Sequence, residues 1–487
     1  MTTNKQRLLT GKSFFSSLTL LLVLPWFSFG QSQAPDLKDL SAFKDPGNNW
    51  KITGNVSADF GKENKLVTSP GTGVLVNVAD KKGSDLFTQN EYGDVDIELD
   101  YMMGFGANSG IYLQGRYELQ LMDNWGDAPP TQGSNGAVYQ RWNDNEPEGK
   151  KGYDGHAPRM NASKAPGTWQ HLKISFQAPR FDANGNKTSN AKMLLVELNG
   201  VILHENLELG GVTRGSIDSK EVAKGPLRLQ GDHGAVAFRN FKITEFNENA
   251  PRKSQLKDPA SEKEEETVDP IMITAASNKI HRSFMDVPNV GRLTHTISVG
   301  TPNKVHFTYD PMTGTIVQAW RGEFLDATPM WHERGDGSSR PAGAVQYFGK
   351  PAPAFAKLDQ QSAAWPKDTV NTAFKPKGYI LDENDMPTFR YVSMGMAIDD
   401  KIRPAEKGQG ITREVTVQNP QPSLYFKLAS AKNIEKVNDW LYLVDDKSYY
   451  LQVDKSSGST PVLRDGSDGS KELLLPVKNK ITYTILF

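Results

Sequence analysis

The segment Asn108-Ser-Gly-Ile-Tyr-Leu-Gln-Gly-Arg-Tyr-Glu-Leu-Gln-Leu-Met-Asp-Asn124 decides the fold expected for the first part of the chain. Its apolar residues fall on odd numbers: Ile111, Leu113, Tyr117, Leu119 and Leu121. The even numbers present a polar set: Tyr112, Gln114, Arg116, Glu118 and Gln120. Alternation with a period of two is typical of a strand with one buried face. The segment therefore predicts a hairpin that turns at Gly115-Arg116 and gathers its polar side chains on one face.

The same alternation continues on both sides of this hairpin. Residues 95–101 alternate apolar and acidic side chains, and residues 172–176 give another half-buried strand. Asn199-Gly200 lies between two apolar runs and predicts a hairpin with a type I′ turn. Evenly spaced strands over residues 35–246 favour an all-β, two-sheet jelly roll, because inward residues from both sheets share one core.

The chain of 487 residues is longer than one hydrophobic core usually serves, so we expect two domains. Residues 247–270 are polar and charged and have almost nothing to bury, so they predict a linker between residues 35–246 and a second domain at 271–487. Three cations precede an apolar run from Phe14 to Phe29, which predicts a cleaved secretory signal peptide over residues 1–30. An uncleaved signal anchor is the alternative.

Charge and cysteine content limit the partners and the location. Without residues 1–30, which hold three cations and no acid, the net charge falls from −1 to −4. This balance argues against nucleic acid, which requires a concentrated cationic surface, and favours a neutral ligand such as a sugar. The chain has no cysteine, which excludes a lipidated N-terminal cysteine, disulfides and thiolate zinc sites. We expect a periplasmic or secreted protein with no stable membrane insertion after signal cleavage.

The polar face of the first hairpin is the candidate site. Amides, an arginine and carboxylates occur together there, and Asp123 and Asn124 follow at the strand end. Trp125, Tyr139 and Trp142 lie nearby in the sequence and could stack on sugar rings. One face of an antiparallel sheet can also simply be wet, and periodicity alone does not separate the two interpretations.

Seven motifs in order give the first domain a family resemblance. They are Gly93-Asp-Val-Asp-Ile-Glu-Leu99, Ala107-Asn-Ser-Gly-Ile-Tyr-Leu-Gln-Gly115, Tyr117-Glu-Leu-Gln-Leu-Met-Asp-Asn124, Gly136-Ala-Val-Tyr139, Pro166-Gly-Thr-Trp169, Leu198-Asn-Gly200, and Leu227-Arg-Leu-Gln-Gly-Asp-His-Gly-Ala-Val-Ala-Phe-Arg-Asn240. Together they resemble the 3-keto-disaccharide (3-keto-glycoside) hydrolase family, which has a concanavalin-like jelly roll. Gln114 stands where the family commonly has Arg, which leaves ligand selectivity open.

The resemblance implies cleavage of glycosides whose sugar carries a ketone at carbon 3. The ketone acidifies the hydrogen on carbon 2, so a base can form an enolate and the group at carbon 1 leaves by β-elimination before water adds. The candidate catalytic residues are Glu118 as base, His233 and Asp123. The candidate substrate-binding residues are Asn108, Gln114, Arg116, Gln120, Asn124, Trp125, Tyr139, His156 and Gln230. No cofactor is required by the sequence, although His156 and His233 could shuttle a proton or hold a divalent metal.

Three alternatives remain open at this stage. His233 in its glycine-rich turn and Asp123 beside Asn124 could simply form hydrogen bonds with nearby backbone groups. A glucanase with acids at spacing 0, 2 and 5 would need a carboxylate where Gln120 stands, and Glu118 with Asp123 would then have to supply the pair that a double displacement uses. A glycan-binding module without catalysis is the third alternative.

Residues 271–487 predict a second β-rich domain, with a supersandwich-like fold. They resemble a module found beside cytochrome-type and sugar-dehydrogenase domains in secreted proteins, but without cysteine no haem attachment is implied. A polar and aromatic cluster in this half could bind a glycan or a metal, or could be a well-bonded loop: Asp326, Trp331, His332, Asp336 and Arg340.

Overall fold

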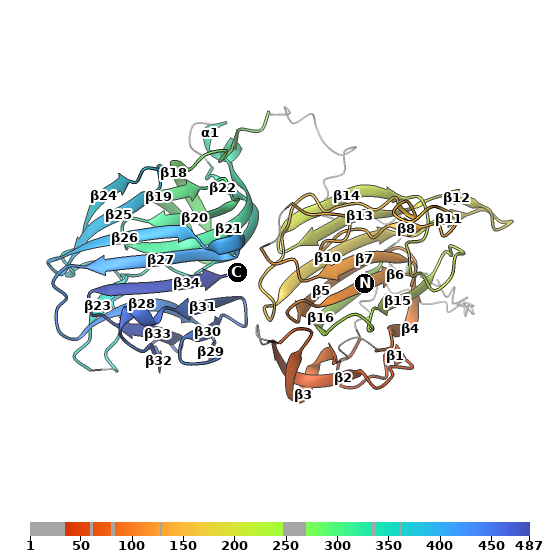
Figure 1. Cartoon of the computed structure of the whole chain (residues 1–487), viewed down its shortest axis with the longest axis horizontal. Helices are drawn as coiled ribbons and strands as arrows, with labels where there is room; N and C mark the ends of the chain where they lie inside the picture. The colour runs from red at the N-terminus through yellow and green to blue at the C-terminus, as the bar shows by residue number, and fades with distance from the viewer. Residues whose placement is uncertain are drawn as a thin grey trace, which may run out of the picture.

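The computed structural model describes residues 35–58, 62–78, 83–126, 129–246, 269–332, 337–360 and 362–487. Strands dominate these residues and form two sandwiches, one on each side of the gap at 247–268 (Figure 1). The helices among the described residues are short: α1 (Thr328–Trp331), η1 (Glu406–Gly408) and η2 (Lys455–Ser457). The prediction of an all-β chain is confirmed. The predicted signal peptide and nearly all of the predicted linker lie outside the described residues.

Two antiparallel sheets build the N-terminal sandwich. The first has the spatial order β1 (Phe43–Lys44), β4 (Leu86–Tyr92), β15 (Gly225–Leu229), β6 (Asn108–Leu113) and β7 (Tyr117–Met122). The second has the order β14 (Val201–Leu209), β13 (Ala191–Leu198), β10 (Gln170–Gln177), β5 (Val95–Met103), β16 (Val236–Glu245), β3 (Leu66–Asn77) and β2 (Trp50–Ala58). Two small ribbons pair β8 (Arg141–Trp142) with β9 (Gly152–Tyr153) and β11 (Arg180–Phe181) with β12 (Lys187–Ser189).

The odd-numbered apolar residues of the first hairpin face the second sheet. Leu119 and Leu121 of β7 share one core with Ile174 of β10, and the rings of Tyr117 and Phe176 lie 5.4 Å apart. Because side chains alternate across a strand, the even-numbered residues of β6 and β7 must then lie on the opposite face of the five-stranded sheet. The predicted hairpin between β13 and β14 is also confirmed, with positive φ at both Asn199 and Gly200.

The even-numbered side chains of β6 and β7 on that opposite face, among them Tyr112, Glu118 and Gln120, are buried. A segment at residues 134–142 runs along the free edge of β7, where Tyr139 N donates to Glu118 O and Gly136 N donates to Gln120 O. A second segment, at 213–217, crosses nearby, and Thr213 Oγ1 accepts a hydrogen bond from Glu118 N. These segments close the edge of β7, and the burial of Glu118 and Gln120 beside them differs from a fully solvated face.

The C-terminal sandwich has an eight-stranded sheet facing two smaller ones. The large sheet has the order β24 (Lys375–Leu381), β25 (Pro387–Ser393), β26 (Met396–Pro404), β27 (Gly410–Val417), β34 (Lys480–Leu486), β31 (Tyr449–Val453), β30 (Leu441–Val444) and β29 (Ile434–Lys436). A second sheet contains β17 (Met272–Ile273), β21 (Thr315–Asp326), β20 (Val305–Asp310), β19 (Gly291–Gly300) and β18 (Lys279–Val287), with β22 (Arg340–Tyr347) paired to β21. A third contains β23 (Phe355–Lys357), β28 (Leu424–Ala431), β33 (Lys471–Pro476) and β32 (Val462–Asp465).

The two sandwiches contact each other through polar groups that are buried between them. Arg321 of β21 donates to Ser163 O at 3.0 Å and to Phe487 O at 2.8 Å. Trp125 Nε1 also donates to Phe487 O, at 2.9 Å. These bonds satisfy backbone carbonyls that the contact removes from water, so the two parts are fitted to one another. No helix of the described residues is long and apolar enough to cross a membrane.

Candidate active site

The candidate site consists of two adjacent rows of side chains across three strands of the five-stranded sheet. In the first row, Arg228 of β15 pairs with Tyr112 of β6, and Tyr112 pairs with Glu118 of β7. In the second row, Gly110 pairs with Gln120, and Gln230 N donates to Gly110 O on the other side. All these positions have the same parity, so the antiparallel register places their side chains on one face.

Gly110 stands at the centre of the second row and leaves room there for the Glu118 side chain. A Cβ atom at position 110 would lie 2.5 Å from Glu118 Oε1, which is far inside van der Waals contact. The carboxyl of Glu118 therefore leans from its own row over the glycine. Any larger residue at position 110 would force the carboxyl to move.

Glu118 is buried, with 2% of its surface exposed. Burial raises the pKa of its carboxyl from 4.5 to about 7, because leaving water disfavours the charged form. A hydrogen bond from Tyr112 and the charge of Arg228 oppose this rise, whereas the negative charges of Asp232 and Asp85 add to it. Near neutral pH, both protonation states of Glu118 are therefore populated.

Arg228 is fixed beside this carboxyl by three contacts. Its guanidinium lies 2.6 Å from Asp85 in an ion pair, donates to Gly215 O and stacks 4.2 Å from the centre of the Tyr112 ring. Arg228 Nε is nevertheless buried with no hydrogen-bond partner among the described residues. Burial and the neighbouring Glu118 charge raise the pKa of Tyr112, so its phenol stays protonated and can donate.

The two amides of the second row also have unused hydrogen-bonding capacity. Gln120 Nε2 donates to Asn108 Oδ1 at 2.8 Å, but Gln120 Oε1 and Gln230 Oε1 are buried and lack partners within the described part of the chain. A buried acceptor without a partner costs about 1–3 kcal/mol, so clustered examples require an explanation. A hydroxyl-rich ligand would supply the missing donors.

The predicted position of the hairpin turn is wrong by one residue. Arg116 N donates to Leu113 O, which makes Gln114 and Gly115 the central turn residues, and both have positive φ. Gln114 lines a small space beside Leu113 and the core residue Phe176, and its amide donates to Tyr92 O and Ala223 O. The physical reason is that two residues with positive φ match the twist of the strands in a tight hairpin.

Arg116 holds a loop rather than the Glu118 rows. Its guanidinium donates to Lys220 O, to Gln114 O and to Asp218 Oδ2 at 2.6, 2.8 and 3.3 Å. These partners use the N–H donors of the guanidinium that a substrate would need. The structure therefore does not bring Gln114 and Arg116 together with Glu118, and a substrate contact by either residue stays an untested prediction.

The residues that follow β7 form the chain bend at its end. Asp123 accepts hydrogen bonds from Gly106 N at 2.8 Å and Trp125 N at 3.3 Å, and Asn124 Oδ1 accepts one from Asn135 N. Trp125 packs against the C-terminal sandwich. The Asp123 contacts favour the alternative in which this side chain hydrogen-bonds only to the local backbone. Trp125 lies between the two sandwiches, where it does not stack on a sugar held by the two rows.

The predicted histidines and Tyr139 lie around the rows rather than in them. His233 is half exposed and its Nδ1 contacts Asp232 Oδ1 at 2.5 Å, in the loop that follows Gln230. His156 pairs through its backbone with Val138, on the segment that borders β7. Tyr139 is partly buried on that same segment. Of these residues, His233 has the clearest link to Glu118, because its partner Asp232 acts on the Glu118 pKa.

Sequence reasoning missed Arg228, Asp85 and Gly110. Arg228 could have been found, because Leu227-Arg228-Leu229-Gln230 alternates like the first hairpin and puts Arg228 on the same face as Gln230. Asp85 precedes β4, the strand that pairs with β15 on its other side, so its contact with Arg228 depends on strand order. Nothing in the sequence spacing indicated that order.

The described residues contain no group of three or more His, Asp and Glu side chains placed to hold a metal ion. In the C-terminal cluster, Asp326 accepts a hydrogen bond from Thr328 N at the start of α1, and Trp331 packs edge-on against His281. Asp336 lies outside the described residues. These contacts favour the well-bonded loop over a metal site at this cluster.

Comparison with solved structures gives 49 matching chains. One is a proposed glycosyl hydrolase of Parabacteroides distasonis, 24% identical, with a TM-score of 0.33, covering 45% of this chain and 84% of its own. A second protein of the same description and organism is 21% identical, with a TM-score of 0.29, covering 44% of this chain and 100% of its own. The carbohydrate-binding module CBM66 of Bacillus subtilis is 9% identical, with a TM-score of 0.22, covering 41% and 97%. These scores are too low to carry an argument about function.

No curated protein matches the sequence. The family described as "3-keto-alpha-glucoside-1,2-lyase-like domain" matches residues 36–244, the span that contains both rows around Glu118. The match confirms the resemblance drawn from the motifs and supports a carbohydrate-active function for this part of the chain. Residues 36–244 therefore match the 3-keto-alpha-glucoside-1,2-lyase-like domain, and the match applies to this N-terminal part of the chain.

Proposed function

We propose that this protein cleaves 3-keto-glycosides by β-elimination followed by hydration, with Glu118 as the base. The observation that carries the proposal is the buried Glu118 carboxyl, whose pKa is raised to about 7 within a group of unsatisfied polar atoms. A general base works best when its pKa lies near the operating pH, because it is then both available and strong enough to accept the proton.

The first step removes the hydrogen on carbon 2 of the oxidised sugar. Glu118 takes that proton, and the electron pair of the broken C–H bond moves to form the C2–C3 double bond of an enolate at the carbon-3 oxygen. The enolate then reforms the ketone as a C1–C2 double bond forms and the C1–O bond to the leaving group breaks. Water later adds across C1–C2 and gives the free 3-keto sugar.

Arg228 and Tyr112 supply donors for the developing negative charge on the carbon-3 oxygen. Both share the first row with Glu118, Tyr112 directly beside it and Arg228 one strand further, and Arg228 Nε has no partner among the described residues. Donors that are fixed in place before the reaction stabilise an enolate without reorganisation. In this proposal, Arg228 takes the role that the sequence suggested for Arg116.

The second row binds the sugar hydroxyls. Gln120 Oε1 and Gln230 Oε1 accept hydrogen bonds from two hydroxyl groups, and Asn108 keeps the Gln120 amide in place through its 2.8 Å bond. The departing oxygen needs a proton, for which we propose His233, in the loop that follows Gln230.

The test is incubation of the full chain with a 3-keto-glucoside, 3-keto-trehalose and their unoxidised parents, with and without EDTA, with released sugar as the readout. We expect release from the keto substrates only. Glu118→Gln should lose at least about 100-fold in kcat, because the variant has no base. Glu98→Gln is the matched control, since Glu98 lies on the other sheet and pairs with His171 and Lys242.

Three results would contradict the proposal. Release from the unoxidised glycosides would indicate ordinary glycosidase chemistry. Tight binding of the keto sugar without turnover, both with and without EDTA, would indicate a binding module. Full activity of Glu118→Gln would remove Glu118 as the base.

A further inference from the structure

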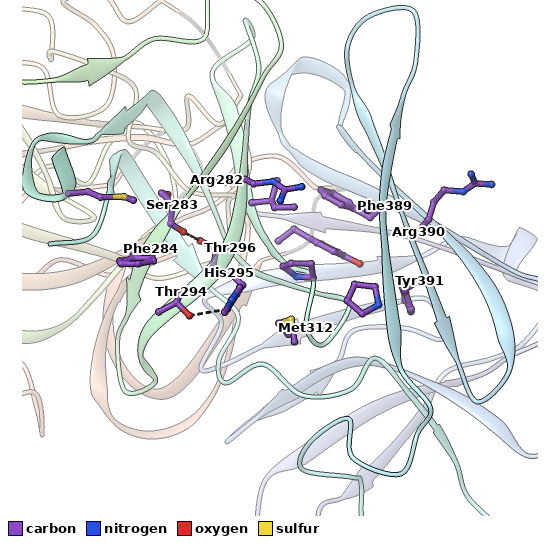
Figure 2. A pocket seen from close by; sticks show the side chains of 16 residues that line it. Arg282, Ser283, Phe284, Thr294, His295, Thr296, Met312, Phe389, Arg390 and Tyr391 are labelled. Atoms are coloured by element: carbon purple, nitrogen blue, oxygen red, sulfur yellow. Dashed lines mark hydrogen bonds between the residues drawn. The ribbon is translucent and has the colours of Figure 1, made fainter. Parts of the chain in front are cut away.

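A cavity of about 340 Å³ opens between two sheets of the C-terminal sandwich (Figure 2). It lies where β18 forms the edge of one sheet and β24 forms the edge of the other. Neither edge strand pairs with the other, so the sheets leave a mouth between them. The volume falls within the range of small-molecule sites. This cavity belongs to the part of the chain that the family match does not cover.

Aromatic rings form the floor of the cavity. Tyr309 of β20 and Phe389 of β25 stack with their centres 3.9 Å apart and their planes at 9°. The phenol oxygen of Tyr309 is already used, because it donates to Asp400 Oδ2, which in turn pairs with Arg413. The floor is therefore rigid and offers ring surface rather than polar atoms.

The remaining walls are largely apolar as well. They include Phe284, Ile297, Pro311, Met312, Met330 and Pro376. Met312 is 47% exposed, so it presents apolar surface at the mouth of the cavity. A sugar would require several convergent polar partners, and this lining provides few of them. A flat apolar ring fits the walls better.

The polar groups of the lining are cationic or neutral, and no carboxylate lines the cavity. Arg282 pairs with no carboxylate in the described residues and lies 5.9 Å from the centre of the Tyr379 ring at the mouth. Arg390, in contrast, pairs with Asp399 and points away from the other labelled side chains in Figure 2. Ser283 is 5% exposed, and its Oγ has no partner among the described residues.

We propose that this cavity binds a small aromatic carboxylate of one or two rings. The ring lies against the apolar walls above Phe389, and the carboxylate pairs with Arg282 at the mouth. Planar recognition of carboxylates is the task for which a free guanidinium is best suited. The assignment is independent of the chemistry at Glu118.

The experiment measures binding of 2-naphthoate to the full chain by titration calorimetry, with 2-naphthamide, glucuronate and glucose as comparison ligands. We expect 2-naphthoate to bind at least about tenfold more tightly than the uncharged amide, since a charge-assisted hydrogen bond is lost in the amide. Glucuronate and glucose should not bind at this site. Arg282→Ala should weaken 2-naphthoate at least about tenfold and leave 2-naphthamide unchanged.

Arg292→Ala is the matched control, because Arg292 is on the same sheet, pairs with Asp286 and does not line the cavity. It should keep wild-type affinity for 2-naphthoate. Met312→Asp, which places a negative charge at the mouth, should abolish 2-naphthoate binding if Arg282→Ala does not fold. Equal affinities for acid and amide, unaltered binding in Arg282→Ala, preference for glucuronate, or no binding of 2-naphthoate at millimolar concentration would each overturn the proposal.

Discussion

Replacement of Glu118 by Gln should change how the free energy of unfolding depends on pH. The size and direction of this change follow from the raised pKa of Glu118. The folded protein holds the Glu118 proton up to about pH 7, whereas the unfolded chain releases it near 4.5. Between these values the folded state binds more protons, so its stability falls as pH rises. The difference of about 2.5 pKa units corresponds to about 3 kcal/mol, all of it present below pH 4.5 and lost above pH 7.

Gln does not titrate, so the Glu118→Gln variant lacks this loss. We expect the variant to gain about 3 kcal/mol relative to the wild type between pH 4.5 and pH 8, whatever its offset at low pH. Urea unfolding of both full-length proteins at half-unit pH steps measures this directly, with attention to the transition of the N-terminal sandwich. A stability difference that stays constant over this range would refute the raised pKa, and with it the case for Glu118 as a neutral-pH base.

Gly110→Ala should reduce kcat on a keto substrate by about 100-fold, because the added Cβ would lie 2.5 Å from Glu118 Oε1 and displace the carboxyl. Asp232→Asn should move the acidic limb of the kcat/KM profile to lower pH, because the charge of Asp232 raises the Glu118 pKa; an unmoved limb would contradict this. Asp400→Asn should cost about 3–5 kcal/mol in urea unfolding of the C-terminal sandwich, because it leaves the buried Arg413 without its charged partner.

Two controls make these results specific. Gly133→Ala adds a methyl group where the nearest atom, Thr131 Oγ1, is 3.9 Å away, so it should keep kcat within about twofold. Asp399→Asn removes a carboxylate adjacent in sequence to Asp400, but its partner Arg390 is exposed, so we expect at most about 1 kcal/mol. A larger loss in either control would mean that the site and core explanations above are wrong.

The sequence predicted which side chains of the first hairpin share a face, because apolar and polar residues alternate there. That alternation placed Glu118 and Gln120 of the candidate site on one face. Side chains alternate along any strand, so Glu118 and Gln120 had to share a face once Leu119 was placed in the core. The Asn199-Gly200 turn was predictable for a similar reason, since its residue types favour positive φ. Local rules of this kind need no knowledge of which strands become neighbours.

Strand order is what the sequence could not supply. Arg228 lies in the same row as Glu118 because β15 inserts between β4 and β6, although β15 follows both strands much later in the chain. The alternation predicts Arg116 on the same face as Glu118, yet the guanidinium of Arg116 donates to Lys220 O and Asp218. Trp125 was likewise placed near a sugar by sequence distance, whereas the C-terminal sandwich covers it.

The position of Gln120 beside Glu118 explains why an amide rather than a carboxylate suits this site. A carboxylate there would add a second negative charge beside a buried one, and like charges would push the Glu118 pKa still higher. Glu118 would then stay protonated at neutral pH and could not take a proton from carbon 2. Asp123, the other carboxylate of a glucanase-type arrangement, has its two oxygens engaged by Gly106 N and Trp125 N. One ionisable acid surrounded by neutral acceptors suits proton abstraction from an acidified carbon better than a double displacement, which requires two.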